Sequence, residues 1–222
     1  MIELNDLFKN NFSEWNELNE HKLDKVIMGL RCIAIIGEAL SKRDDLKHHI
    51  ICCKIYDEIF SDGVSGLYLA AIAMDKPANI VLRRIVELGV AAVYLWDMPH
   101  MAYSWNEFDH DLSFSEMLKH VNSKGYIAYV EACNSSEIPK EIYPSSRLQR
   151  IYGLLSDVVH GKITTFESSM PNRFKFIESE WLDFVNLAEE IVCILVKAFL
   201  VRFELAEEVF IELPLAKKEF DL

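Results

Sequence analysis

Apolar residues recur every three to four positions along most of the chain, which is the spacing of an amphipathic helix. No segment alternates with a period of two for long enough to predict a strand. After a short amphipathic segment over residues 1–12, the pattern predicts helices over residues 13–41, 46–60, 78–98, 113–133, 147–161 and 178–210. We therefore expect an all-α protein, a single-domain bundle of about six to seven helices with a long C-terminal helix.

Polar or irregular stretches separate these predicted helices. Residues 61–63, with the sequence Ser-Asp-Gly, are expected to break or bend an apolar run. Residues 99–112 are polar and aromatic and are predicted to be irregular, Gly125 weakens the helix around it, and the charged tail over residues 214–222 is predicted to be loose. No glycine–serine linker, repeat or low-complexity tract divides the chain, so residues 1–222 are predicted to form one domain.

Composition supports a helical, well-packed protein. Hydrophobic residues make up 51% of the 222 residues, enough for a sizeable core, and 8 Gly and 6 Pro are too few for a loop-rich β-sandwich. The chain has 23 basic and 35 acidic residues, and its net charge of −12 argues against broad, nonspecific adhesion to nucleic acid. A small local basic site remains compatible with this charge.

Cysteine usage and hydropathy indicate the compartment. The five cysteines form no CxxC pair, their number is odd, and most lie in apolar helical contexts, which is typical of buried, reduced thiols. The N-terminus lacks the basic start and apolar run of a secretion signal. The most apolar windows, residues 63–74 and 191–201, are shorter than the roughly 18 residues of a membrane span. We expect a soluble, cytoplasmic protein that does not enter a membrane.

The predicted helix over residues 147–161 carries most of the candidate chemistry. It follows Pro144, with Ser145 or Ser146 placed to cap it, and it stops at Gly161, the residue type that best adopts the left-handed turn closing a helix. His160 then lies at the end of the helix, where free carbonyl groups favour a positive imidazolium.

A polar stripe runs along this helix. Ser156 lies one turn before His160 and Tyr152 two turns before it, because residues four apart share a helix face. Together with Arg147 and Arg150 these groups suit the hydrolysis or transesterification of a phosphodiester, with an imidazole moving protons and a guanidinium offsetting phosphate charge. The structural alternative is a helix whose Tyr and His satisfy hydrogen bonds in a core while its Arg residues lie on the surface.

Charges inside the most apolar helix form a second candidate. Arg83 and Arg84 both lie within pairing range of Glu87, at spacings of four and three. One interpretation is a structural buried ion pair. The other is that Glu87 orients Arg84 or Arg83 against a phosphate or against His160, as a pairing carboxylate does for many catalytic groups.

Two sets of residues could in principle ligate a metal, and both are better explained without one. His48 and Cys52, like His49 and Cys53, are four apart, but zinc sites usually need at least three protein ligands and no partner pair stands out. The acidic residues around His110 are more typical of a solvated loop; they are Glu107, Asp109 and Asp111. The chain has no GxGxxG, P-loop, GxSxG or HExxH motif, and we expect no cofactor.

Two short patterns resemble those of a known superfamily. Residues 80–87, Ile-Val-Leu-Arg-Arg-Ile-Val-Glu, resemble an "LLRsllE" helix, and residues 152–161, Tyr-Gly-Leu-Leu-Ser-Asp-Val-Val-His-Gly, resemble a "YxxLSxxvHg" helix. Both occur in this order, at about this distance, in bacterial helical proteins similar to the HEPN superfamily. The resemblance covers about residues 57–205 and leaves residues 1–45 as additional N-terminal helices.

The resemblance implies a helical bundle, usually dimeric. Many HEPN proteins are metal-independent ribonucleases of toxin–antitoxin, CRISPR-linked and phage-defence systems, whose active pair is an Arg followed, after about four to six residues, by a His. His160 matches the His, but positions 154 and 155 are Leu and Arg150 lies ten positions before His160. Either another Arg substitutes in space, with Arg84 as the leading candidate, or the domain only binds.

Three hypotheses follow for function. In the first, an RNase-like effector acts on RNA: His160 is the general acid or base, Arg84 or Arg150 holds the phosphate, and Tyr152 and Ser156 orient the RNA or the imidazole. In this hypothesis Arg83, Arg147 and Arg150 bind substrate and Glu87 supports the catalytic group. In the second, a non-catalytic helical module forms a homodimer or binds a partner protein from the same operon, using the apolar seam of residues 178–210. The third is metal-dependent chemistry from the His48–Cys53 region.

Overall fold

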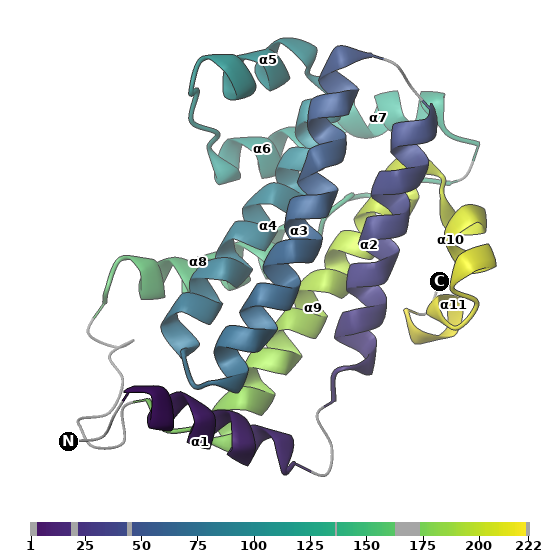
Figure 1. Cartoon of the computed structure of the whole chain (residues 1–222). Coiled ribbons are helices and arrows are strands. Elements are labelled where there is room, and N and C mark those ends of the chain that lie inside the picture. The colour runs from purple at the N-terminus through teal and green to yellow at the C-terminus, as the bar shows by residue number, and fades with distance from the viewer. Residues whose placement is uncertain (1–3, 19–21, 44–45, 136, 163–173, 221–222) are drawn as a thin grey trace.

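The computed structural model describes residues 4–18, 22–43, 46–135, 137–162 and 174–220 (Figure 1). All regular elements within these ranges are helices, which confirms the all-α prediction. The eleven helices are α1 (Leu4–Asn16), α2 (Asp24–Arg43), α3 (Lys47–Ala71), α4 (Asp75–Asp97), α5 (Pro99–Glu107), α6 (Phe114–Val121), α7 (Lys124–Cys133), α8 (Ser145–Val159), α9 (Glu178–Phe203), α10 (Ala206–Glu212) and α11 (Ala216–Glu219).

Four long helices form the centre of the molecule. Helix α3 packs against α2 on one side and α4 on the other, and both α2 and α4 pack against α9, so the four helices enclose one core (Figure 1). The apolar faces seen in the sequence point inward here, with Ile33, Ile59, Val90 and Leu195 all fully buried. Burial of these apolar faces is the main stabilising contribution to a helical bundle.

Small residues allow the central helices to approach closely. A side chain added at Gly63 of α3 would lie 2.4 Å from Leu30 of α2, and one added at Gly89 of α4 would lie 2.3 Å from Leu195 of α9. These glycines therefore serve the helix packing, because no room remains for a methyl group between the facing helices.

Shorter elements cover the ends and sides of the four central helices. Helix α1 crosses one end, α5, α6 and α7 lie at the other, α8 packs against α4, and α10 and α11 pack against α2 (Figure 1). Asn11 attaches α1: its amide donates to the carbonyl oxygens of Ile72 at 3.0 Å and Phe174 at 2.8 Å, and its oxygen accepts from the N–H of Phe176 at 3.1 Å. The Asn11 side chain is 2% exposed, so these hydrogen bonds fix α1 to the neighbouring segments.

A buried ion pair joins α4 to α9. Arg202 of α9 donates through Nε to the Asp97 carboxylate at 2.8 Å and makes a second contact with it through Nη2. The Tyr126 hydroxyl of α7 donates to the same carboxylate at 2.5 Å. Burial opposes the charge of Arg202, but the carboxylate of Asp97 outweighs that effect and raises the pKa of the guanidinium.

Several predicted helix boundaries were wrong. The predicted helix over residues 13–41 is two helices, because α1 continues through Ser13 to Asn16 and α2 begins at Asp24. Residues 61–63 do not interrupt the helix and lie inside α3. Gly63 is small enough there to let Leu30 of α2 pack against it. The prediction of an irregular stretch at 99–112 missed α5, which begins with Pro99 at its first position.

The remaining errors concern helix ends. The helix predicted over 113–133 is divided at Asn122 and Ser123 rather than weakened at Gly125, because the Ser123 hydroxyl caps α7. The long C-terminal helix stops at Phe203, where Glu204 adopts a left-handed conformation with φ 50°, and α10 follows. Of the tail predicted to be loose over residues 214–222, residues 221–222 lie outside the described ranges. Residues 214–220 contain α11, and Phe220 is 1% exposed, so this part is packed. These divisions raise the number of helices above the predicted six to seven.

Only some of the cysteines are buried, although the sequence predicted buried thiols. Cys32 and Cys52 are buried free thiols, Cys53 and Cys193 are half-buried, and Cys133 is exposed. Among the described helices, none combines the length and apolar character required to cross a bilayer.

Candidate functional site

Helix α4 presents its two adjacent arginines to different neighbours. Successive residues on an α-helix point about 100° apart, so Arg83 faces α8 while Arg84 faces α3. Arg84 donates to Asp62 at 2.5 Å and to Glu58 at 2.6 Å, both on α3. The leading candidate for the phosphate-binding arginine is therefore held away from α8, and Arg83 takes the position beside it.

Arg83, Glu87 and Tyr152 form a closed hydrogen-bonded triad. Arg83 donates through Nη2 to the Tyr152 hydroxyl at 2.9 Å and lies 3.0 Å from the Glu87 carboxylate, and Tyr152 donates to the same carboxylate oxygen at 2.9 Å. The guanidinium carbon also lies 5.1 Å from the centre of the Tyr152 ring. The triad connects the two sequence patterns, because Arg83 and Glu87 belong to the first and Tyr152 to the second.

Electrostatics favour the charged form of Arg83. Burial opposes its charge, but the hydrogen bond with Tyr152 and the negative charge of Glu87 outweigh burial and raise the pKa of the guanidinium. Its Nε atom is buried and donates to no described residue. Both contacts that Arg83 makes in the triad use Nη2, so Arg83 retains donors for an anionic group.

A pocket of about 350 Å³ lies beside the triad. Its wall from α6 includes Phe114, whose ring stacks on Tyr152 with 4.0 Å between centroids and 12° between planes. Ser113 accepts from the N–H of Glu116 and caps α6, and Ser115 and Gln149 also line the pocket. An arginine, three hydroxyls, a carboxamide and a carboxylate around one opening suit a ligand that carries both an anion and hydrogen-bonding groups.

Ser156 and His160 lie outside this pocket. The Ser156 hydroxyl is buried and has no hydrogen-bond partner within the described residues, whereas the His160 side chain is exposed at the end of α8. Gly161 adopts φ +60° and closes the helix as predicted. Tyr152 and His160 are eight positions apart, a rise of about 12 Å along the helix axis. One chain therefore does not bring the imidazole of His160 to the triad.

The start of α8 differs from the prediction. Pro144 occupies the N-cap position and no side chain caps the helix there, so neither Ser145 nor Ser146 plays that role. The Ser145 hydroxyl instead accepts from the side-chain amide of Asn122 at 2.7 Å, and its backbone N–H donates to Glu141 at 3.2 Å.

The two arginines near the start of α8 face α9. Arg147 is paired with Glu190, and Arg150 lies 3.4 Å from the same carboxylate. Both arginine side chains are more than half exposed. The structure therefore groups Arg83, Glu87 and Tyr152, and places Arg84, Arg147, Arg150, Ser156 and His160 outside that group.

The proposed metal-ligand sets do not gather around a common point. His49 stacks on Trp96, with 3.6 Å between ring centroids, and its Nε2 atom lies 3.1 Å from the Trp96 carbonyl oxygen. Across the described ranges, no group of three or more His, Cys, Asp or Glu side chains is arranged to hold a metal ion.

The sequence analysis placed a helix start at residue 113 but did not identify α6 as a wall of the pocket. Ser113 and Glu116 have the spacing of a capping box, which fits the observed start at Phe114. No sequence signal pairs Phe114 with Tyr152, however, because 38 positions separate them and only the packing of α6 and α8 against α4 brings their rings together.

Comparisons with known proteins identified no relative of this chain. Neither the scan against protein-family models nor the searches of curated proteins and solved structures found a match.

Proposed function

We propose that this chain is a HEPN-like RNA-processing protein whose functional groups lie on α4 and α8. The observation that supports the proposal is the triad, in which Tyr152 of the "YxxLSxxvHg" pattern binds Arg83 and Glu87 of the "LLRsllE" pattern. Two patterns separated by 64 residues of intervening sequence thus meet through one hydrogen-bonded group. A shared site gives a physical reason for charged residues within the largely apolar helix α4.

In this proposal Arg83 replaces Arg84 as the residue that binds phosphate. Arg83 is already oriented by Glu87 and Tyr152 and borders the pocket, whereas the donors of Arg84 are directed to two carboxylates. A pre-oriented guanidinium loses less conformational entropy when it binds a phosphate.

His160 supplies proton transfer in a site completed by a second copy of the chain. Its exposed position at the end of α8 leaves the imidazole accessible to another molecule, and about 12 Å of helix rise separates it from Tyr152 in one chain. Dimerisation with two α8 helices side by side and antiparallel would bring His160 of each copy toward Arg83 and Tyr152 of the other. The resulting homodimer would be an endoribonuclease effector of a toxin–antitoxin or phage-defence system.

RNA cleavage by the purified protein tests this proposal. We expect tRNA or mRNA to be cut in the presence of a chelator, and His160→Ala to reduce the rate by about 10²–10⁴-fold because a general acid or base is lost. Arg83→Ala should also reduce cleavage, while the matched change Arg84→Ala should leave it within about threefold, the scale of a surface ion pair. Circular dichroism checks that each variant is folded.

Two results would reject the catalytic proposal. One is intact RNA after incubation with concentrated wild-type protein, together with normal growth of cells that express it. The other is a monomer in analytical ultracentrifugation that cleaves RNA as fast at low as at high protein concentration, because the composite site requires two copies.

A second candidate function is a non-catalytic module that binds a partner protein from the same operon. The pairing of Arg84, Arg147 and Arg150 with carboxylates favours it, because these cations are already partly neutralised in a chain of net charge −12. Stable association with a co-expressed neighbouring gene product, unchanged by His160→Ala and without RNA cleavage, would support this function over the first.

A further inference from the structure

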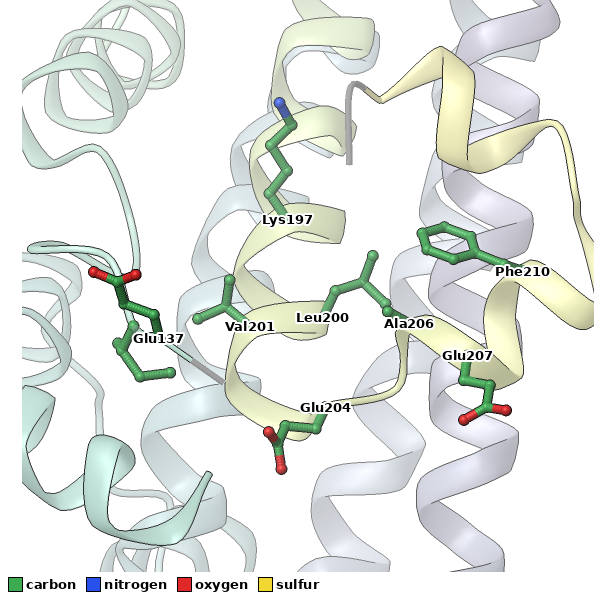
Figure 2. A pocket seen from close by; sticks show the side chains of 9 residues that line it. Glu137, Lys197, Leu200, Val201, Glu204, Ala206, Glu207 and Phe210 are labelled. Atoms are coloured by element: carbon green, nitrogen blue, oxygen red, sulfur yellow. The ribbon is translucent and has the colours of Figure 1, made fainter. Parts of the chain in front are cut away.

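A groove follows the outer face of α9 at the end where α10 begins. Its floor is apolar and comes from three parts of the chain: Leu200 and Val201 of α9, Phe210 of α10, and Ile138 of the segment before α8 (Figure 2). The hollow measures about 560 Å³. A second hollow of about 390 Å³ shares Val201 and Lys197 with the first and continues along α9 past Ile194.

The spacing of the floor residues suits another helix. Ile194, Lys197 and Val201 are separated by three or four positions and lie along one face of α9, and Glu204 follows just after the helix ends, so the four span about 15 Å. Side chains at this spacing leave grooves into which the ridges of a second helix can pack. A helix of about three turns therefore matches the length of the floor.

Charge distinguishes among possible occupants. Three carboxylates border the apolar floor near α10, namely Glu137, Glu204 and Glu207, against one cation, Lys197. Glu204 is held in place by the N–H of Ser135 at 2.7 Å, while Glu137 and Glu207 are exposed. Figure 2 shows the Lys197 side chain extending away from Glu204, so the carboxylates determine the charge at the α10 end of the groove.

We propose that this groove docks an amphipathic helix of a partner protein, with leucine-type residues on the floor and lysine or arginine facing Glu137, Glu204 and Glu207. We choose a basic helix because its positive side chains would complement the carboxylates that border the groove. A second copy of this chain, with net charge −12, would be repelled by the same rim, as would RNA phosphates or an anionic lipid surface.

This docking surface is separate from the α4–α8 site. Helix α10 lies at the opposite edge of the molecule from the C-terminal part of α8 (Figure 1). None of the groove residues belongs to the triad. The inference therefore goes beyond the proposed RNA chemistry and can hold or fail independently of it.

Peptide binding to the full chain tests the proposal. The probe is a fluorescent peptide of about 18 residues with leucine along one helical face and lysine elsewhere, at about 0.15 M salt. The control peptide has glutamate in place of every lysine. We expect saturable binding of the lysine peptide and none of the glutamate peptide.

Matched variants locate the binding surface. Val201→Arg places a bulky cation on the floor and should weaken binding by about tenfold or more, whereas Val64→Arg, at an exposed valine of α3, should change it by less than about twofold. The double variant Glu137→Gln/Glu207→Gln should weaken binding by about threefold or more. Glu14→Gln/Glu17→Gln on and after α1 gives the same change in net charge and should have little effect.

Several outcomes would overturn the inference. Equal weakening by the two glutamine double variants would show that binding follows net charge rather than the groove. Equal binding of the glutamate peptide would reject charge complementarity. Binding of phosphatidylserine vesicles or single-stranded RNA that Val201→Arg removes would assign the groove to a different partner. No binding of the lysine peptide to folded wild-type protein would also reject the proposal.

Discussion

At the scale of single residues, the direction of a side chain decides which charges act together. Arg83 and Arg84 have the same chemistry, and they lie four and three positions before Glu87 in the sequence. The helix places them about 100° apart, so one joins Tyr152 and the other joins Asp62. The sequence identifies both arginines as candidates. Which carboxylate or hydroxyl each one contacts depends on which helix packs on each side of α4.

The Arg202–Asp97 pair should be important for stability. Both side chains are less than one-tenth exposed, so Arg202→Met would leave a buried carboxylate without its cation and should lower the free energy of unfolding by about 3–5 kcal/mol. Urea denaturation measures this change. Arg84→Met, at an ion pair with Glu58 that is about half exposed and one with Asp62 whose side chain is 13% exposed, is the control and should cost less, about 1 kcal/mol.

The double variant Asp97→Asn/Arg202→Met gives a further check. It removes the uncompensated charge and should recover part of the stability lost in Arg202→Met. Equal losses for Arg202→Met and Arg84→Met would contradict a special role for the buried pair.

At the scale of elements, helix interiors were more predictable than helix ends. The periodic apolar positions of α4 and α9 marked them as helices because their buried faces extend over many turns. Ends depend on single groups, such as the Ser123 hydroxyl that starts α7 or the left-handed Glu204 that stops α9. Several residue types satisfy such local requirements, so the sequence alone left these boundaries open.

Replacing Gly89 or Gly153 with alanine should change the free energy of unfolding in opposite directions. Gly89→Ala would place its methyl group 2.3 Å from buried Leu195, and the resulting displacement of α4 or α9 should cost about 1–3 kcal/mol. Gly153 of α8 is exposed and has open space around it, so Gly153→Ala should stabilise the helix by about 0.5–1 kcal/mol. Urea denaturation of both variants checks the signs; destabilisation by Gly153→Ala would contradict the open environment of that position.

At the scale of the whole molecule, packing creates two surfaces that no single helix contains. The triad pocket needs α4, α6 and α8, and the α9 groove needs α9, α10 and the segment before α8. One surface borders a cation held among hydroxyl groups, and the other borders carboxylates around an apolar floor. The proposed RNA site and the proposed partner-binding groove therefore differ in charge, although both lie on a chain with a net charge of −12.

Stability should fall in alkaline solution. Burial raises the pKa of Cys32 to about 11 and that of Cys52 to about 12, above the value of 9.0 for an exposed thiol. The folded state holds these protons more tightly than the unfolded state. Their contribution is therefore complete below about pH 9 and is lost as the pH rises toward 11–12.

Urea midpoints measured between about pH 8 and pH 10.5 check this prediction. The variant Cys32→Ala/Cys52→Ala should show a shallower fall than the wild type, although its stability at neutral pH is lower because two buried side chains are shortened. Buried Tyr56 and Tyr143, whose pKa values burial also raises, remain in both proteins and account for the residual slope. Identical slopes would show that the two thiols do not contribute.

The sequence by itself determined that the protein is helical and which faces of the long helices are buried, because apolar periodicity is a local property that each segment carries alone. It also brought Arg83, Glu87, Tyr152 and His160 forward as candidates through their residue types and spacing. Only the tertiary structure decided which of them meet: Tyr152 reaches Arg83 and Glu87 because α8 packs on α4, while His160 stays exposed beyond the helix end. Contacts between segments far apart in sequence depend on how whole helices pack, and no local pattern encodes that packing.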